Sequence, residues 1–229
     1  MIGLKRNIVL LMFLPVLVIM ILGCTSKNQA SNSNEYVIDQ SDFINANEFI
    51  ENIEKSDLSD EEISGLVLMR EEEKLARDVY LKLYEIWGSR IFYNVAESEQ
   101  THTNAVKVLL DRYNIEDPVK DDSIGVFTSQ ELLKLYEDLV SDGSSSLLNA
   151  LIVGATIEDL DIKDLNDLLE KTDNEDITII YNTLVRGSRN HLRAYVKQIN
   201  YNGGSYSPKY ISQEEFNTII SSPQETGRI

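Results

Sequence analysis

SDEEISGLVLMREEEKLARDVYLKLYEIW, residues 59–87, predicts one long amphipathic helix. Ser59 and Glu62 have the spacing of a capping box, and Gly88-Ser89 would end the helix. Apolar residues recur at helical spacing, on a stripe that contains Leu66, Met69, Glu73, Ala76, Tyr80 and Leu83. Glu73 therefore lies where a core residue is expected. Glu72 is the alternative, because Leu68, Leu75 and Val79 share its face.

Three more long helices are predicted, from Arg90 to Tyr113, from Ser144–Ser146 to about Lys171, and from a capping box at Thr172–Glu175 to about Asn200. The first and second helices are joined tightly, and so are the third and fourth. Ile115–Gly143 forms a long connection with its own short helix, capped by Thr128 with Glu131. Among four-helix bundles, one long crossover between helices two and three is the ferritin-like pattern. We therefore predict an all-α, ferritin-like four-helix bundle.

Two shorter helices flank these four. Ser212 to Glu215 is a further capping box that would start a short helix near the C-terminus. Asp42 to Glu54 is predicted as a small amphipathic helix before the main domain. No stretch has the pattern of a strand.

Ionisable residues interrupt the apolar stripes of the other helices. Glu99 and His102 share one stripe of the second helix, three residues apart, so both can point at a common position. Glu158 and Asp161 lie on the inward stripe of the third helix, and His191 on that of the fourth. A charge in a core is costly unless it is paired or bound to metal. Carboxylate oxygens with imidazole nitrogens suit iron, manganese or zinc.

Simpler explanations exist for each residue alone. Glu-x-x-His pairs are common on helix surfaces, and a histidine on an apolar stripe is often a hydrogen-bonded core residue. Glu158 and Asp161 also belong to an acidic stretch, residues 158–167, that could face solvent. The metal-site hypothesis depends on the coincidence across four helices and on both histidines of the chain.

The amino terminus has the pattern of an export signal. Lys5 and Arg6 precede an almost wholly apolar run, Asn7 to Leu22, which ends at Gly23-Cys24. This run resembles the lipobox of prokaryotic lipoproteins, in which lipid is attached to the cysteine. The alternative is an uncleaved signal anchor. In either case the domain would face the extracytoplasmic side of the cell membrane.

The predicted organisation follows from these boundaries. It comprises a signal peptide (1–23), a lipidated flexible tether with a short helix (24–56), the four-helix bundle (57–222) and a tail (223–229). The net charge of −17 repels phosphate backbones, which argues against a nucleic-acid partner. Cys24 is the single cysteine, so an intrachain disulfide is excluded.

Four runs together resemble an uncharacterised ferritin-like family, domain of unknown function family 2202. They are residues 69–80, 96–102, 154–161 and 187–193, within a region of similarity from about Leu58 to Ile220. The wider superfamily, which includes rubrerythrins, binds two metals through Glu on helix one, Glu-x-x-His on helix two, Glu on helix three and Glu-x-x-His on helix four. The residues matching this pattern are Glu73, Glu99, His102, Glu158 and His191.

One position departs from the superfamily pattern. Ser188 stands where the helix-four glutamate is expected. Asp161 could replace it, since rubrerythrin-like sites carry a second acid on helix three; otherwise the site would hold one metal. Tyr80 resembles the tyrosine often found beside such sites.

Three functions remain open at this point. The first is a redox metalloenzyme acting on peroxide, dioxygen or ferrous iron, with an external electron donor because no rubredoxin-like cysteine motif is present. The second is a metal-binding or storage lipoprotein, and the third a metal-free interaction module. The expected cofactor is iron or manganese, as one or two ions, with zinc as a further option. The expected partners are the membrane, through lipid on Cys24, and the metal ions, with a homodimer left open.

Overall fold

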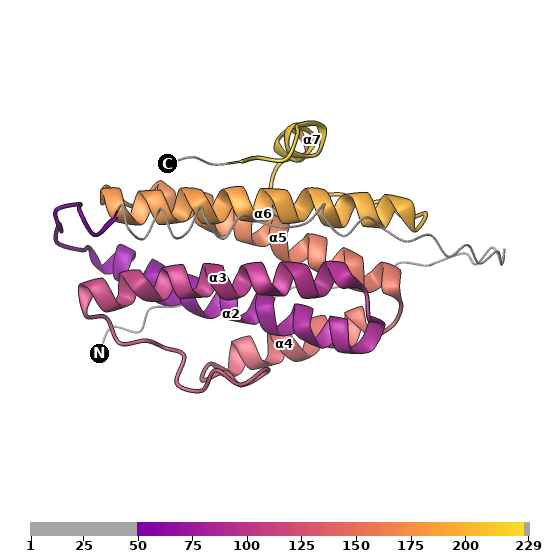
Figure 1. Ribbon diagram of the computed structural model, residues 1–229, viewed down its shortest axis with the longest axis horizontal. Helices are drawn as coiled ribbons and strands as arrows, with labels where there is room; N and C mark the ends of the chain where they lie inside the picture. The colour runs from indigo at the N-terminus through magenta and orange to yellow at the C-terminus, as the bar shows by residue number, and fades with distance from the viewer. Residues whose placement is uncertain (1–49, 227–229) are drawn as a thin grey trace. The chain divides into compact units, whose positions relative to one another are not determined.

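The computed structural model describes residues 50–226. This part of the chain forms six α-helices and no strand, which confirms the all-helical class (Figure 1). The helices are α2 (Asp60–Trp87), α3 (Arg90–Tyr113), α4 (Gln130–Gly143), α5 (Leu147–Leu169), α6 (Glu175–Tyr201) and α7 (Gln213–Ser221). Within the described range, no helix combines the length and apolarity that a membrane span requires. The predicted signal peptide and Cys24 lie outside these residues.

Local hydrogen bonds explain where α2 begins and ends. The backbone N–H of Glu62 donates to Ser59 Oγ at 3.2 Å, and the backbone N–H of Ser59 donates to Glu62 Oε2 at 2.8 Å. Gly88 ends the helix at a φ of +61°, a conformation that glycine adopts without steric cost. The predicted capping box and break are both confirmed.

Two predicted helix starts are wrong. Ser129, rather than Thr128, precedes α4, and its Oγ accepts a hydrogen bond from the Leu132 backbone N–H. Asn174 precedes α6 without a side-chain cap, so the predicted capping box at Thr172 does not form. The Thr172 hydroxyl instead donates to Glu62 Oε1 at 2.6 Å, because the start of α6 lies beside the start of α2.

The predicted helix at Asp42–Glu54 is only partly covered by the structure. Ile50 is helical and buried, whereas residues 51–53 form a turn and bend. The helix therefore stops short of Glu54. Residues 42–49 lie outside the described part of the chain.

The four long helices pack lengthwise in two pairs. The most extensive contacts are between α2 and α3 and between α5 and α6, and contacts of α2 with α5 and of α3 with α6 join the pairs. Each pair is antiparallel, while α3 and α5 run in the same direction (Figure 1). The chain between α3 and α5 therefore returns along the helices, and its α4 packs on α2 and α5.

The apolar core is divided into two clusters with a polar layer between them. One cluster contains Ala76, Ala96, Ile162 and Leu192, and the other contains Met69, Ala105, Leu165 and Leu184. Along α2, α3 and α6, the buried residues Glu73, Glu99, His102 and His191 each lie in the sequence between a member of one cluster and a member of the other. Apolar side chains thus seal this layer at both ends.

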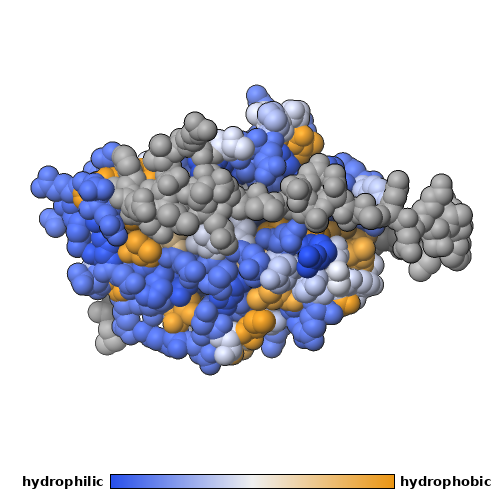
Figure 2. Space-filling view, viewed as in Figure 1, coloured by the Kyte–Doolittle hydropathy of each residue, from blue (hydrophilic) through white to orange (hydrophobic). Residues whose placement is uncertain are grey.

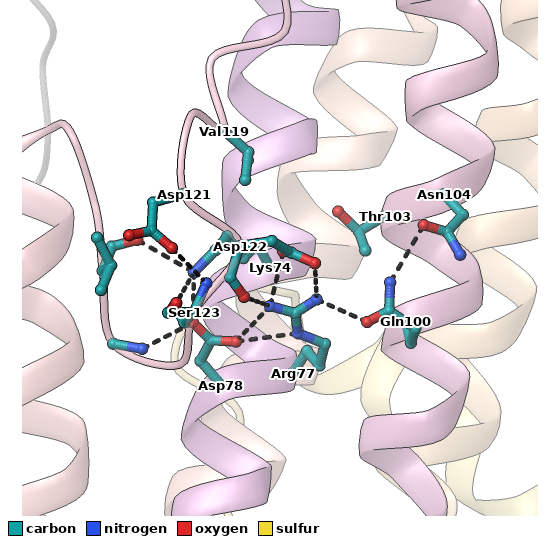
Figure 3. A network of polar contacts seen from close by, with 12 residues as sticks. Lys74, Arg77, Asp78, Gln100, Thr103, Asn104, Val119, Asp121, Asp122 and Ser123 are labelled. Carbon is teal, nitrogen blue, oxygen red and sulfur yellow. Dashed lines mark hydrogen bonds and ion pairs between the residues drawn. The ribbon is translucent and has the colours of Figure 1, made fainter.

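A buried polar network fixes the connection between α3 and α4 against α2 (Figure 3). The Lys74 ammonium donates to Asp78 Oδ2 at 2.6 Å and to the carbonyl oxygens of Ser123 and Val126. Arg77 donates to Asp78 Oδ1 and also bonds Asp122. The connection is therefore attached to α2 through two buried cations that share one carboxylate.

The described surface carries few large apolar side chains. The face in Figure 2 is mostly hydrophilic, and its apolar residues form small, separate groups. Among the large apolar side chains of residues 50–226, the most exposed is that of Tyr201 at the end of α6. Scattered residues of this kind are normal on a folded domain.

Candidate metal centre

Five buried ionisable side chains meet in the polar layer. Glu73 comes from α2, Glu99 and His102 from α3, Glu158 from α5 and His191 from α6. None is more than 3% exposed. The helical stripes predicted from the sequence therefore converge.

These five side chains form two groups of three that share Glu99. Glu73 and Glu99 lie with His102 in one group, and Glu99 and Glu158 with His191 in the other. Within each group one oxygen or nitrogen per residue lies within 4.8 Å of the others, close enough to bind one ion together.

The two groups have nearly the same geometry. His102 Nδ1 lies 2.8 Å from Glu99 Oε2 and 3.2 Å from Glu73 Oε2. His191 Nδ1 lies 2.8 Å from Glu99 Oε1 and 3.2 Å from Glu158 Oε2. The imidazole rings are stacked, with centroids 5.4 Å apart. Glu99 thus presents one carboxylate oxygen to each histidine.

Hydrogen bonds do not satisfy this cluster. Within residues 50–226, Glu73 Oε1 and Glu99 Oε1 are buried and have no hydrogen-bond partner. Glu99 Oε1 approaches His191 Nδ1 closely, but the angles are not those of a hydrogen bond. Burying a carboxylate oxygen without a hydrogen-bond partner costs free energy. A bound cation would remove that cost, because it would accept the lone pairs of the oxygens and balance their negative charge. The donor set of oxygens and imidazole nitrogens fits iron, manganese or zinc.

The protonation states in the layer follow from burial and from the neighbouring charges. Burial raises the pKa of the Glu73, Glu158 and Asp161 carboxyl groups. Burial acts in the same direction on Glu99, but the two histidines on either side outweigh it and hold its pKa well below the ordinary range. Burial lowers the pKa of His191, but Glu158 and Glu99 outweigh it and raise the value to about 9. Without metal, protons supply the positive charge that the carboxylates require.

The other predicted site residues surround the two groups. The Tyr80 hydroxyl donates to Glu158 Oε1. The Ser188 hydroxyl donates to Asp161 Oδ2, and Asp161 belongs to neither group of three although its pKa responds to Glu73, Glu158 and Glu99. The side chain of Asp161 is also partly accessible to solvent. Ser188 thus orients the nearby acid.

Glu73, and not the alternative Glu72, lies in the polar layer. Glu72 is partly exposed and belongs to neither group. Its charge acts on the hydroxyl of Tyr181 instead, whose pKa it helps to raise. One residue along a helix turns the side chain by about 100°, which is enough to take Glu72 out of the layer.

Two features of the site were missed in the sequence. Tyr195 packs against Tyr80 with ring centroids 5.4 Å apart, and its buried hydroxyl has no partner among the described residues. Gly187 lies against His102, where a Cβ atom would come within 2.6 Å of Nε2. Gly154 likewise makes room for the Tyr195 ring. Glycines in helix interiors were the available signal, because glycine there is destabilising unless close packing requires it.

Comparison with known proteins agrees with the earlier resemblance. The chain is 58% identical over 180 residues to the uncharacterized protein MJ0754 of Methanocaldococcus jannaschii, covering 79% of this chain and 97% of that protein. The crystal structure of hypothetical protein MJ0754 is similar, with a TM-score of 0.75 over 76% of this chain and 99% of that one. Residues 62–223 match the family described as an uncharacterized protein domain, DUF2202. The chain therefore belongs to the DUF2202 family.

Proposed function

We propose that the protein is a ferritin-like metal-binding protein that holds one or two transition-metal ions in the polar layer between its long helices. Iron and manganese are the expected ions, with zinc as the alternative. The observation that carries the proposal is the position of Glu99, which directs one carboxylate oxygen to each histidine. Two adjacent three-ligand sites would then share one bridging carboxylate, with Glu73 and Glu158 as the outer carboxylates.

The helix arrangement supports the ferritin-like assignment. Two antiparallel pairs are joined by a chain that returns along their length, which is the connectivity of a four-helix bundle with one long crossover. Proteins of that class build metal sites from carboxylates and histidines on facing helices. The present cluster draws on all four long helices.

Redox chemistry is the activity that we propose to test first, although the same ligands would also serve storage. Held by these residues, iron or manganese would supply one-electron redox chemistry, in which peroxide or dioxygen is reduced by electrons from an external donor or from ferrous iron as substrate. The chain's own residues would hold the ions, and the apolar clusters above and below the layer would limit the access of water along the helices. An external electron donor would complete the cycle.

The cellular location is part of the proposal. The amino-terminal pattern of Lys5, Arg6 and the apolar run ending at Cys24 supports export and lipid attachment. The domain would then work on the extracytoplasmic side of a membrane. Radiolabelled lipid incorporation into the full chain, lost in Cys24→Ala, tests this part separately.

The first experiment measures metal content in protein purified without a histidine tag. We expect one or two equivalents of iron or manganese, and a large loss in Glu73→Gln. Glu72→Gln is the matched control, because it makes the same chemical change one residue away, outside the two groups. His102→Ala should also lose metal, while Lys107→Ala on the exposed face should not. Equal occupancy in Glu73→Gln and Glu72→Gln would contradict the assignment.

The second experiment separates turnover from storage. The reduced, metal-loaded protein is mixed with peroxide, and peroxide consumption is followed against the metal-free form. Metal binding without turnover would establish the storage function. The metal-free module would be established instead if the purified protein contains no metal and if neither added metal nor chelator changes its melting temperature.

A further inference from the structure

The two histidines of the centre differ at the ring edge that faces away from the carboxylates. At His102 this edge is covered by α6, since a Cβ atom added at Gly187 would come within 2.6 Å of Nε2 and 2.7 Å of Cε1. His191 instead lines a cavity of about 490 Å³, and its buried Nε2 has no hydrogen-bond partner within residues 50–226. Because its Nδ1 is directed at Glu99 and Glu158, the edge with Nε2 is the part of the ring turned toward the cavity. The same imidazole therefore borders both the cavity and the centre.

The outer wall of this cavity is the chain that follows α7. Ser222 and Gln224 line it from that side, while residues of α6 and Val95 of α3 form much of the remaining wall. Residues 222–226, here called the strap, have neither helical nor strand structure. Helix α7 packs on α6 (Figure 1), and the strap continues from its end. A short irregular segment of this kind opens at a lower free energy than the helices beneath it.

The strap is attached to α6 at residues that flank His191. The Glu225 carboxylate accepts hydrogen bonds from Arg189 at 2.8 and 2.5 Å and from Arg193 at 2.7 Å. The Glu225 backbone is paired with the Asn190 side chain, because its N–H donates and its carbonyl oxygen accepts, both at 2.9 Å. Glu225 therefore fixes the strap over the cavity through its side chain and its backbone.

Small solutes have a more open route to the centre from this side than along the helices. Apolar side chains fill the bundle above and below the polar layer, whereas at the side the His191 ring is itself part of the cavity wall. Val95, Ala194 and Ile220 give the cavity an apolar part, in which a charged solute would lose hydration. We propose that this cavity is the lateral entrance to the centre for small uncharged solutes, such as water and peroxide, and that the strap is its lid, held closed by Glu225. Only the purpose of the entrance rests on the proposed function, because water would reach His191 by this route whether or not metal is bound.

The entrance is tested by hydrogen–deuterium exchange at the Cε1 atoms of the two histidines. The metal-free full chain is incubated in D₂O, where an imidazole in contact with solvent slowly exchanges its Cε1 proton for a deuteron, and peptide masses give the rate at each ring. The chain has 2 histidines, so each rate is assigned without overlap. We expect His191 to exchange about tenfold faster than His102, because solvent reaches its ring without separation of the helices.

Two variants change the entrance in opposite directions. Glu225→Gln removes the anion that binds both arginines and should raise the His191 exchange rate about tenfold, the usual effect of losing charge-assisted hydrogen bonds on the population of an open state. Ala194→Leu adds apolar atoms at the cavity wall and should slow exchange at His191. Glu214→Gln, at an exposed residue of α7, is the matched control and should leave the rate unchanged. His102 should exchange at the wild-type rate in all three variants.

Three results would overturn the proposal. Equal exchange at His191 and His102 in the wild type would exclude the entrance. An unchanged His191 rate in Glu225→Gln would exclude the lid. An equal rise at both histidines in that variant would exclude it too, because it would reflect loosening of the whole domain. None of these measurements involves metal, so their failure is distinct from a finding that the purified protein binds no metal.

Discussion

Gly187→Ala is the substitution that most directly tests how the centre is built. Gly187 lies inside α6, where alanine would favour the helix by about 1 kcal/mol. Its added Cβ would lie 2.6 Å from His102 Nε2 and 2.7 Å from Cε1, whereas ordinary contact begins at 3.4 Å. The imidazole or the helix must therefore move by about 0.8 Å.

His102 has little freedom to make that movement. Its ring is fully buried, stacked on His191 and held at Nδ1 by Glu73 and Glu99. Overpacking of a core costs about 1–3 kcal/mol. After the gain in helix propensity, we expect the metal-free variant to be destabilised by about 0–2 kcal/mol.

The effect on metal binding should be much larger than the effect on stability. Ligand atoms must be placed within about 0.2 Å, so a displacement several times larger disrupts the site. We expect metal affinity to fall about 10- to 100-fold, as when a group that orients a ligand is lost. Competition with a chelator of known affinity measures this change, and urea unfolding of the metal-free proteins measures the stability change.

Gly65→Ala is the control for this experiment. Gly65 also lies inside a long helix, and its added Cβ would lie 2.7 Å from Leu168 Cδ2, an overlap as severe as that at Gly187. The neighbour in this case is an apolar side chain outside the centre. It should affect stability and leave metal affinity unchanged. Wild-type metal affinity in Gly187→Ala would show that His102 does not bind metal in the position described here.

Three further predictions concern stability. Glu62→Ala should lower the free energy of unfolding at pH 7 by about 2 kcal/mol, since a helix cap and interhelical hydrogen bonds are lost; Glu61→Ala is the exposed control in urea unfolding. Burial alone would raise the Glu62 pKa, but hydrogen bonds from Asn174, Thr172 and Ser59 lower it to about 2. Because the folded pKa is the lower one, this stabilisation is present above pH 4.5 and is lost as the pH falls toward 2, so the difference between wild type and variant should shrink over that interval. Lys74→Ala removes one of the two cations bound to Asp78 and should lower the free energy of unfolding by about 3–5 kcal/mol. It should also make residues 115–129 sensitive to limited proteolysis, whereas Lys82→Ala, at an exposed ion pair, should have neither effect. Removing metal with chelator should lower the melting temperature by about 10 °C if the free ion had been held near a thousand times its dissociation constant, and an unchanged melting curve would contradict metal binding.

The contact of Ser188 with Asp161 bears on how many ions the proposed site would hold. Ser188 occupies the position of the expected helix-four glutamate and bonds Asp161, which lies near the three glutamates without joining either group of three. Ser188→Ala would free Asp161 to turn. If Asp161 is a ligand when metal is bound, Asp161→Asn should reduce the metal content from two equivalents toward one.

The sequence by itself determined the helices and the face of each that is buried. The capping box at Ser59, the break at Gly88 and the boundaries of α2 and α3 follow from short-range hydrogen bonds and backbone preferences, which are encoded within a few residues. Helical periodicity is equally local, so Glu99, His102 and His191 could be assigned to inward stripes without knowing what they would meet.

Only the tertiary structure decided which of these atoms lie together. The choice of Glu73 over Glu72, the sharing of Glu99 between two histidines and the pairing of Ser188 with Asp161 depend on how each helix is rotated against its neighbours. The same holds for Thr172, whose hydroxyl donates to Glu62 on α2 instead of forming the predicted capping box. Those rotations are set by packing between residues far apart in the chain, and a pattern within one helix carries no information about them.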